Sequence, residues 1–252
     1  MKNDNTNKFS YSEYVEILKF YSSIIIDFKD VDSFDNKYCV LRHDVEFSLE
    51  RALSMAKLDF QYGVKSSFFI QVMNSAYNPL STINKKILRK IIDYGHNVGL
   101  HFYTSHILEN DLEKLKKELK IQTSILENCI EEAVDRFSYH RPSKWVLKLD
   151  TLEFSSLLNA YSKEFFELLT DEKLPTNIKY IADSNHCWRY GHPLENHPYE
   201  YFQLCLHPDE WSERGGSDLE NFKALISEQE LLFIENIDSE YKTFAKIKKY
   251  FV

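Results

Sequence analysis

The sequence lacks three features that would each indicate a particular class of protein: a long apolar run, a clustered basic tract and a CxxC pair. No stretch approaches the roughly 18 uninterrupted apolar residues of a membrane-spanning helix. The net charge is −8 and the basic runs are short, whereas binding to nucleic acid needs clustered cations. We therefore expect neither a membrane span nor a nucleic-acid partner.

The four cysteines, Cys39, Cys129, Cys187 and Cys205, are widely spaced. This spacing indicates reduced, mostly buried thiols rather than a disulfide framework. Residues 1–8 are polar and carry no apolar core of a secretory signal, so a cytoplasmic location is expected. The sequence leaves the oligomeric state open.

The chain has enough apolar residues for a full core, since 43% of its 252 residues are hydrophobic and 15% are aromatic. Chains of this length often form one α/β barrel, so we predict a single domain over residues 1–252. Short apolar runs alternate with longer amphipathic ones, a pattern typical of parallel α/β folds.

We expect six or seven strands, among them 38–42, 64–72, 97–102, 136–139, 179–182 and 201–206. The predicted helices are an N-terminal one at about 10–28, two that begin after Ser48 and Ser81, and further ones at 111–133 and 152–161. A charged helical extension is predicted over about 217–252.

Polar side chains follow the predicted strands, at the ends where the active sites of parallel barrels lie. They are Asp44 and Glu46, His101 and His106, His140 and Arg141, Asp183, and His207. Two imidazoles and a carboxylate are the ingredients of a metal site, so a metal-dependent hydrolase is the first hypothesis. Asp44 and Glu46 alternate along a strand end, so both side chains are expected to point into the same site.

Several segments, in this order along the chain, resemble the motifs of the polysaccharide deacetylase (NodB-homology, carbohydrate esterase family 4) superfamily: Leu41 to Ser48, Gly95 to His106, Tyr139 to Ser143, Asp183-Ser184 with Trp188-Arg189, and Leu206-His207-Pro208 with Trp211. They are most similar to the shorter members associated with surface-polysaccharide biosynthesis. The resemblance implies a distorted (β/α)7 barrel, a divalent metal that is usually Zn2+, and hydrolysis of an N-acyl group on a sugar.

The resemblance also implies roles for the residues of these motifs. His101 and His106 would be metal ligands, although their spacing is one residue longer than in the usual motif. His207 would be the general acid, oriented by Asp183, and Arg141 would orient the base. For the acids, one alignment makes Asp44 the base and Glu46 a ligand. The other places His43 in the first-acid position and makes Asp44 the ligand.

Four further residues are predicted to bind substrate by the same resemblance: His140, Trp188, Arg189 and Trp211. For Trp188, Arg189 and Trp211, the sequence leaves open whether they stack on a sugar ring or close the core.

Three functions remain open from the sequence. The first is removal of an acetyl or formyl group from a free or carrier-linked amino sugar during polysaccharide assembly. The second is hydrolysis of a non-sugar C–N bond, as in allantoinase-like relatives. The third is a catalytically silent barrel that binds carbohydrate.

Overall fold

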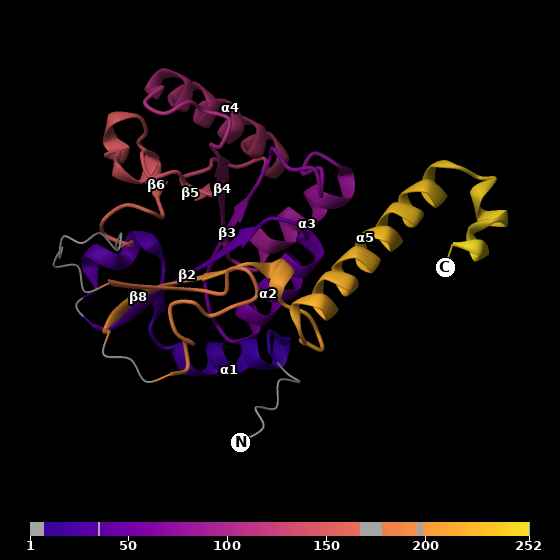
Figure 1. Ribbon diagram of the computed structural model, residues 1–252, viewed down its shortest axis with the longest axis horizontal. Coiled ribbons are helices and arrows are strands. Elements are labelled where there is room, and N and C mark those ends of the chain that lie inside the picture. The colour runs from indigo at the N-terminus through magenta and orange to yellow at the C-terminus, as the bar shows by residue number, and fades with distance from the viewer. Residues whose placement is uncertain (1–7, 35, 167–177, 196–198, 252) are drawn as a thin grey trace.

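A computed structural model describes residues 8–34, 36–166, 178–195 and 199–251. Its strands are all parallel and form one sheet in the order β6-β5-β4-β3-β2-β8-β7, with β1 beside β2 (Figure 1). The strands are β1 Ile25–Ile26, β2 Tyr38–Val45, β3 Ser67–Ile70, β4 Asn97–Tyr103, β5 Arg136–His140, β6 Leu158–Asn159, β7 Ile178–Ala182 and β8 Tyr201–Leu206.

The α-helices are α1 Tyr11–Tyr21, α2 Leu49–Gln61, α3 Thr82–Asp93, α4 Leu112–Ile130 and α5 Asp218–Glu240. Short 3-10 helices occupy Phe28–Ser33, Val146–Lys148, Thr151–Glu153, Pro208–Glu210, Phe244–Lys246 and Lys248–Tyr250. Serine side chains begin the helices as expected: Ser48 accepts a hydrogen bond from the backbone of Arg51, and Ser81 from that of Asn84. No helix within the described residues is both long and apolar enough to span a membrane.

The sheet curls so that residues of distant strands meet on its concave side. Arg42 of β2 donates a 2.8 Å hydrogen bond to the hydroxyl of Tyr161, which lies just beyond β6 at one edge of the sheet. Within the described residues, the sheet ends at β6 and β7 and does not close between them. This arrangement is a distorted barrel of parallel strands with flanking helices, so the predicted fold class is confirmed.

Strand β2 runs through the middle of the molecule and is buried on both faces. Leu41 packs with Tyr14 and Ile17 of α1 on the convex side, whereas Val40 packs with Phe69 on the concave side. Because side chains alternate along a strand, Arg42 and the residues at every second position beyond it also face the concave side. The strand therefore divides its residues between a structural core and the interior of the barrel.

Gly99 shows how tightly the concave side is filled below the strand ends. A Cβ at this position would lie 2.7 Å from Cγ of Arg136 and 2.8 Å from the ring of Phe69. A side chain would displace these neighbours, which are themselves nearly fully buried. The glycine two residues before His101 is therefore a packing requirement of the barrel interior.

Two predicted helices differ from the structure. The helix expected over about 10–28 ends at Tyr21, because Ile25 and Ile26 pair with β2 as the short strand β1. Residues 152–161 do not form a helix, because Leu158 and Asn159 pair with β5 as β6. Both strands are two residues long, and pairing with a neighbouring strand decides their conformation.

The C-terminal extension is helical, as predicted, but it does not cover the barrel. Helix α5 extends away from the barrel and ends in two short 3-10 turns (Figure 1). Its contact with the barrel includes a bidentate ion pair between Arg51 of α2 and Glu228.

Candidate active site

Three potential metal ligands meet at the ends of strands β2, β4 and β5. The Oε1 atom of Glu46 lies 2.8 Å from Nδ1 of His140 and 3.3 Å from Nε2 of His101, and the two ring nitrogens are 3.1 Å apart. His101 and His140 are buried, while Glu46 is partly open to solvent. The three atoms converge on one point from three strands.

The hydrogen bonds of His101 fix the state of its ring. Ser138 donates its hydroxyl proton to Asp44 at 3.2 Å, so its oxygen must accept the 2.8 Å hydrogen bond from Nδ1–H of His101. In the neutral ring, Nε2 then carries a lone pair that faces the carboxylate of Glu46. Two acceptors 3.3 Å apart repel each other unless a cation lies between them.

This donor set fits a divalent metal ion. Ligand atoms about 2.1 Å from a tetrahedral ion lie roughly 3.4 Å apart, close to the observed separations of 2.8 to 3.3 Å. The hydrogen bond from His101 to Ser138 is the kind of outer contact that orients metal-binding histidines. Burial alone would raise the pKa of Glu46, yet its contacts with the His101 and His140 rings lower it, so the ionised form is favoured.

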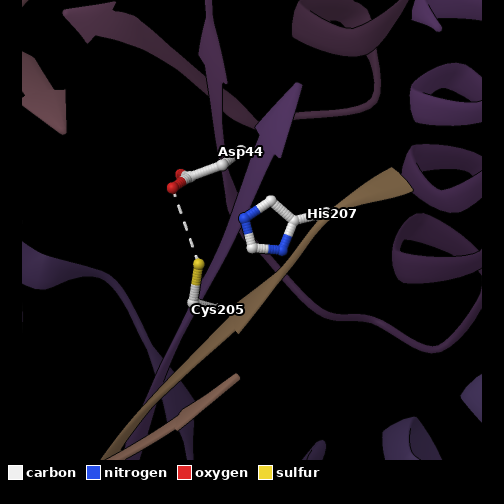
Figure 2. A group of neighbouring side chains, drawn as sticks. All are labelled: Asp44, Cys205 and His207. Carbon is white, nitrogen blue, oxygen red and sulfur yellow. Dashed lines mark hydrogen bonds between the residues drawn. The ribbon is translucent and has the colours of Figure 1, made fainter. Parts of the chain in front are cut away.

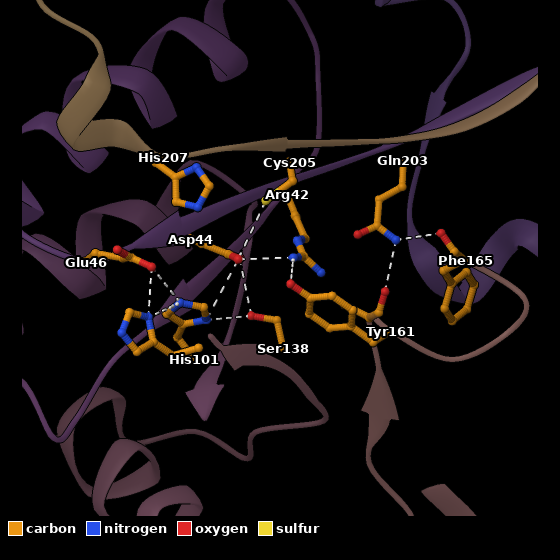
Figure 3. Close-up of polar contacts among 12 residues, drawn as sticks. Arg42, Asp44, Glu46, His101, Ser138, Tyr161, Phe165, Gln203, Cys205 and His207 are labelled. Atoms are coloured by element: carbon orange, nitrogen blue, oxygen red, sulfur yellow. Dashed lines mark hydrogen bonds and ion pairs between the residues drawn. The ribbon is translucent and has the colours of Figure 1, made fainter. Parts of the chain in front are cut away.

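Asp44 lies beside this group, deeper in the barrel. Its Oδ2 accepts a 3.1 Å hydrogen bond from Nη2 of Arg42, and its Oδ1 accepts the proton of Ser138 (Figure 3). Burial opposes ionisation, but the charge of Arg42 lowers the pKa of Asp44 below its usual value. Asp44 is therefore held as a carboxylate within the barrel.

His207 and Asp183 form a hydrogen-bonded pair on the other side of Asp44. Nδ1 of His207 lies 2.6 Å from Oδ1 of Asp183, which also accepts the backbone N–H of His207. The indole of Trp211 donates to Asp183 at 2.7 Å. Burial of the ring acts to lower the pKa of His207, but the Cys205 sulfur and the Asp183 carboxylate raise it well above its usual value. This ring can hold a proton at neutral pH.

Two predicted site residues lie away from this centre. His106 stacks on Tyr103, and its Nε2 lies 3.6 Å from Glu118, whereas the third potential ligand grouped with Glu46 and His101 is His140. Arg141 is exposed, and the arginine that contacts Asp44 is Arg42. The loop after β4 turns His106 outward toward α4, and Arg141 lies one position beyond the inward-facing His140 on β5.

The four residues predicted to bind substrate also lie in different parts of the structure. Trp211 is completely buried and binds Asp183, so it cannot stack on a sugar. Trp188 packs against Phe9 and Trp211 in the cluster beneath α1 and is partly buried. Arg189 is exposed in the same segment. Of the four residues, His140 alone belongs to the group around Glu46.

Sequence reasoning missed Arg42, Ser138 and Cys205. Each lies two residues before a residue that was singled out: Asp44, His140 and His207. Because side chains alternate along a strand, a residue at this distance points into the same interior. The predicted strands therefore contained the information needed to find these residues, two positions before each residue that was singled out.

No family model and no curated protein matches the chain. Solved structures of similar fold include a CE4 family pseudoenzyme from Bacillus anthracis, with 16% identity over 77% of this chain and a TM-score of 0.45. The chain spans 61% of the length of that pseudoenzyme.

Two further structures of similar fold match over most of both chains. A family 4 carbohydrate esterase from Bacillus anthracis is 17% identical, with 85% of this chain and 84% of that chain covered and a TM-score of 0.44. A mutant of the peptidoglycan deacetylase PdaC from Bacillus subtilis is 12% identical, with coverage of 82% and 96% and a TM-score of 0.43. At these identities the likeness is one of fold alone.

Proposed function

We propose that this protein is a metal-dependent hydrolase that removes an N-acyl group from an amino sugar. The observation that supports the reaction is the donor set of Glu46, His101 and His140 beside the His207–Asp183 pair. Metal ligands next to a protonated histidine are the parts that amide hydrolysis needs. The sugar, and a place in polysaccharide assembly, are the parts of the proposal that come from the motif resemblance.

Glu46, His101 and His140 would hold the ion, and two imidazoles with one carboxylate favour Zn2+. Such an ion supplies Lewis acidity, which polarises the acyl oxygen and lowers the pKa of a bound water. His106, the ligand expected from the sequence, is replaced in this proposal by His140.

The remaining residues move protons. Asp44, kept ionised by Arg42, accepts a proton from the attacking water. His207 gives its proton to the departing nitrogen, which would otherwise leave as an unstable anion. Asp183 holds Nδ1 of His207, so that Nε2 is the atom that faces the reaction. Arg42 takes the base-orienting role that the resemblance assigned to Arg141.

The test measures how much metal the wild type and variants of the candidate ligands bind. Purified wild type and His106→Ala are expected to bind the first equivalent of Zn2+ or Co2+ tightly, whereas His140→Ala and Glu46→Gln are expected to lose this tightly bound equivalent. Release of acetate or formate from N-acylated amino sugars should follow the same order. The proposal is wrong if the wild type takes up no divalent ion on reconstitution, or if His106→Ala loses the metal and His140→Ala keeps it.

A further inference from the structure

A second group of potential metal ligands lies next to the first. Asp44, Cys205 and His207 come from the adjacent strands β2 and β8, and their ligand atoms all lie within 4.8 Å of one another (Figure 2). Arg42 and Cys205 are direct partners in the β2–β8 register, so Asp44 and His207, each two positions on, share the same face. The group shares no ligand with Glu46, His101 and His140.

The distance between sulfur and carboxylate suits a bound ion. Sγ of Cys205 lies 3.6 Å from Oδ2 of Asp44. A tetrahedral zinc ion with Zn–S of about 2.3 Å and Zn–O of about 2.1 Å separates these two ligand atoms by roughly 3.6 Å. The same contact serves as a weak hydrogen bond when the thiol is protonated, and burial raises the pKa of Cys205 to about 11.

The third ligand is oriented for coordination. Asp183 binds Nδ1 of His207, so the free Nε2 is the nitrogen available to an ion beside Asp44 and Cys205. A carboxylate on the far nitrogen is the usual support of a histidine that binds zinc. Thiolate, imidazole and carboxylate together form a donor set that favours zinc and similar soft divalent ions.

The surrounding charge also allows a second cation. Arg42, 3.1 Å from Asp44, disfavours a dication nearby. The negative charges of Asp44, Asp183 and a Cys205 thiolate would balance Arg42 and a dication together. All three ligands are buried or nearly so, which limits the screening of these charges by water.

We propose that a second thiophilic divalent cation binds to Asp44, Cys205 and His207 and inhibits the enzyme. The inhibition rests on the proposed function, because this ion would occupy the proposed base and the Nε2 of the proposed acid. Binding of the ion rests only on the three ligands. The protein would thus be active with one equivalent of metal and lose activity as a second equivalent binds.

Titration of the metal-free protein with Co2+ tests this site spectroscopically. A thiolate bound to Co2+ gives a charge-transfer band in the near ultraviolet, and the ligands of the first site contain no sulfur. The wild type should therefore develop visible d–d bands with the first equivalent and the near-ultraviolet band with the second. Cys205→Ser should keep the visible bands, lack the near-ultraviolet band, and need at least about tenfold more Zn2+ for half-inhibition.

Cys187→Ser is the matched control, since Cys187 is exposed, and it should keep the near-ultraviolet band. Cys205→Ala, compared with Cys205→Ser by circular dichroism, shows whether loss of the band reflects loss of fold. A band that survives in a folded Cys205 variant, or a wild type with no band at saturating Co2+, overturns the second site. Loss of the visible bands in His101→Ala concerns the first site, so failure of the proposed function is distinguishable from failure of this inference.

Discussion

Two buried histidine–aspartate pairs among the described residues, His43–Asp59 and His207–Asp183, are similar in distance and different in setting. Nitrogen and oxygen are 2.9 Å apart in the first pair and 2.6 Å in the second. Both side chains of the first pair are completely buried, whereas the ring of His207 is 14% exposed. The first pair lies on the convex side of the sheet beneath α1, and the second opens into the barrel.

The difference lies in what surrounds each pair. Asp59 accepts hydrogen bonds from Tyr14, His43 and Ser66, so its carboxylate ties α1, α2 and the sheet together. All four side chains of this network are buried. His207 instead presents Nε2 to Asp44, beside the donor set of Glu46. A histidine–aspartate pair therefore acts in structure or in chemistry according to the face of the strand from which it projects.

Disruption of the His207–Asp183 pair is expected to have the largest effect on activity. His207→Ala should lower kcat by about 10²–10⁴-fold, the usual contribution of a positioned general acid. The free energy of unfolding should fall less than in Asp59→Ala, because Asp183 keeps its hydrogen bonds from the backbone N–H of residue 207 and from Trp211. Acyl release from an amino sugar and urea denaturation measure the two effects. A large loss of stability without loss of kcat would place His207 in the structural class of His43.

Disruption of the His43–Asp59 pair should lower stability and leave activity nearly unchanged. Asp59→Ala removes the buried carboxylate that accepts from Tyr14 and Ser66, which is expected to lower the free energy of unfolding by about 3 kcal/mol. Metal content and kcat of the folded fraction should stay near those of the wild type. Tyr14→Phe, which removes one of the three contacts, serves as the milder control. Equal stability of Asp59→Ala and wild type would show that the network contributes nothing.

Much of the fold could be predicted because its signals are local. The apolar runs of β4, β5 and β8 and the serine caps of α2 and α3 are each encoded within a few residues. The segments of β1 and β6 could not be predicted, since each is two residues long and owes its conformation to a partner strand. For them, long-range pairing overrides local preference.

The candidate site likewise contains residues that could be predicted from the sequence and residues that could not. Glu46, His101, Asp183 and His207 could be found because each follows a strand, and parallel strands align their ends. The exchange of His106 for His140 could not, because the path of the loop after β4 decides where His106 points. Arg42 acts on Asp44 from within the same strand, a relationship that motif order along the chain does not reveal.

A third pair, His186–Glu210, offers the smallest and most specific test of the comparison. Nδ1 of His186 lies 2.9 Å from Glu210, and Nε2 donates to the carbonyl of Gly216 when the ring is charged. Burial opposes charge, but Glu210 and this carbonyl raise the pKa of His186, with Asp218 adding a smaller effect. The two side chains are 7% and 8% exposed, and the pair belongs neither to the network around Asp59 nor to the barrel interior.

Because the pKa of His186 is higher in the folded than in the unfolded chain, its stabilisation is fully present below the unfolded value of about 6.5 and disappears as pH rises through the folded value. The wild type should therefore exceed His186→Gln in urea midpoint by more at about pH 5.5 than at about pH 9. His207 is common to both proteins and cancels in the difference. A midpoint difference that is equal at the two pH values would mean that His186 acts through packing against Phe9, whose ring centroid is 4.1 Å away, and not through its charge.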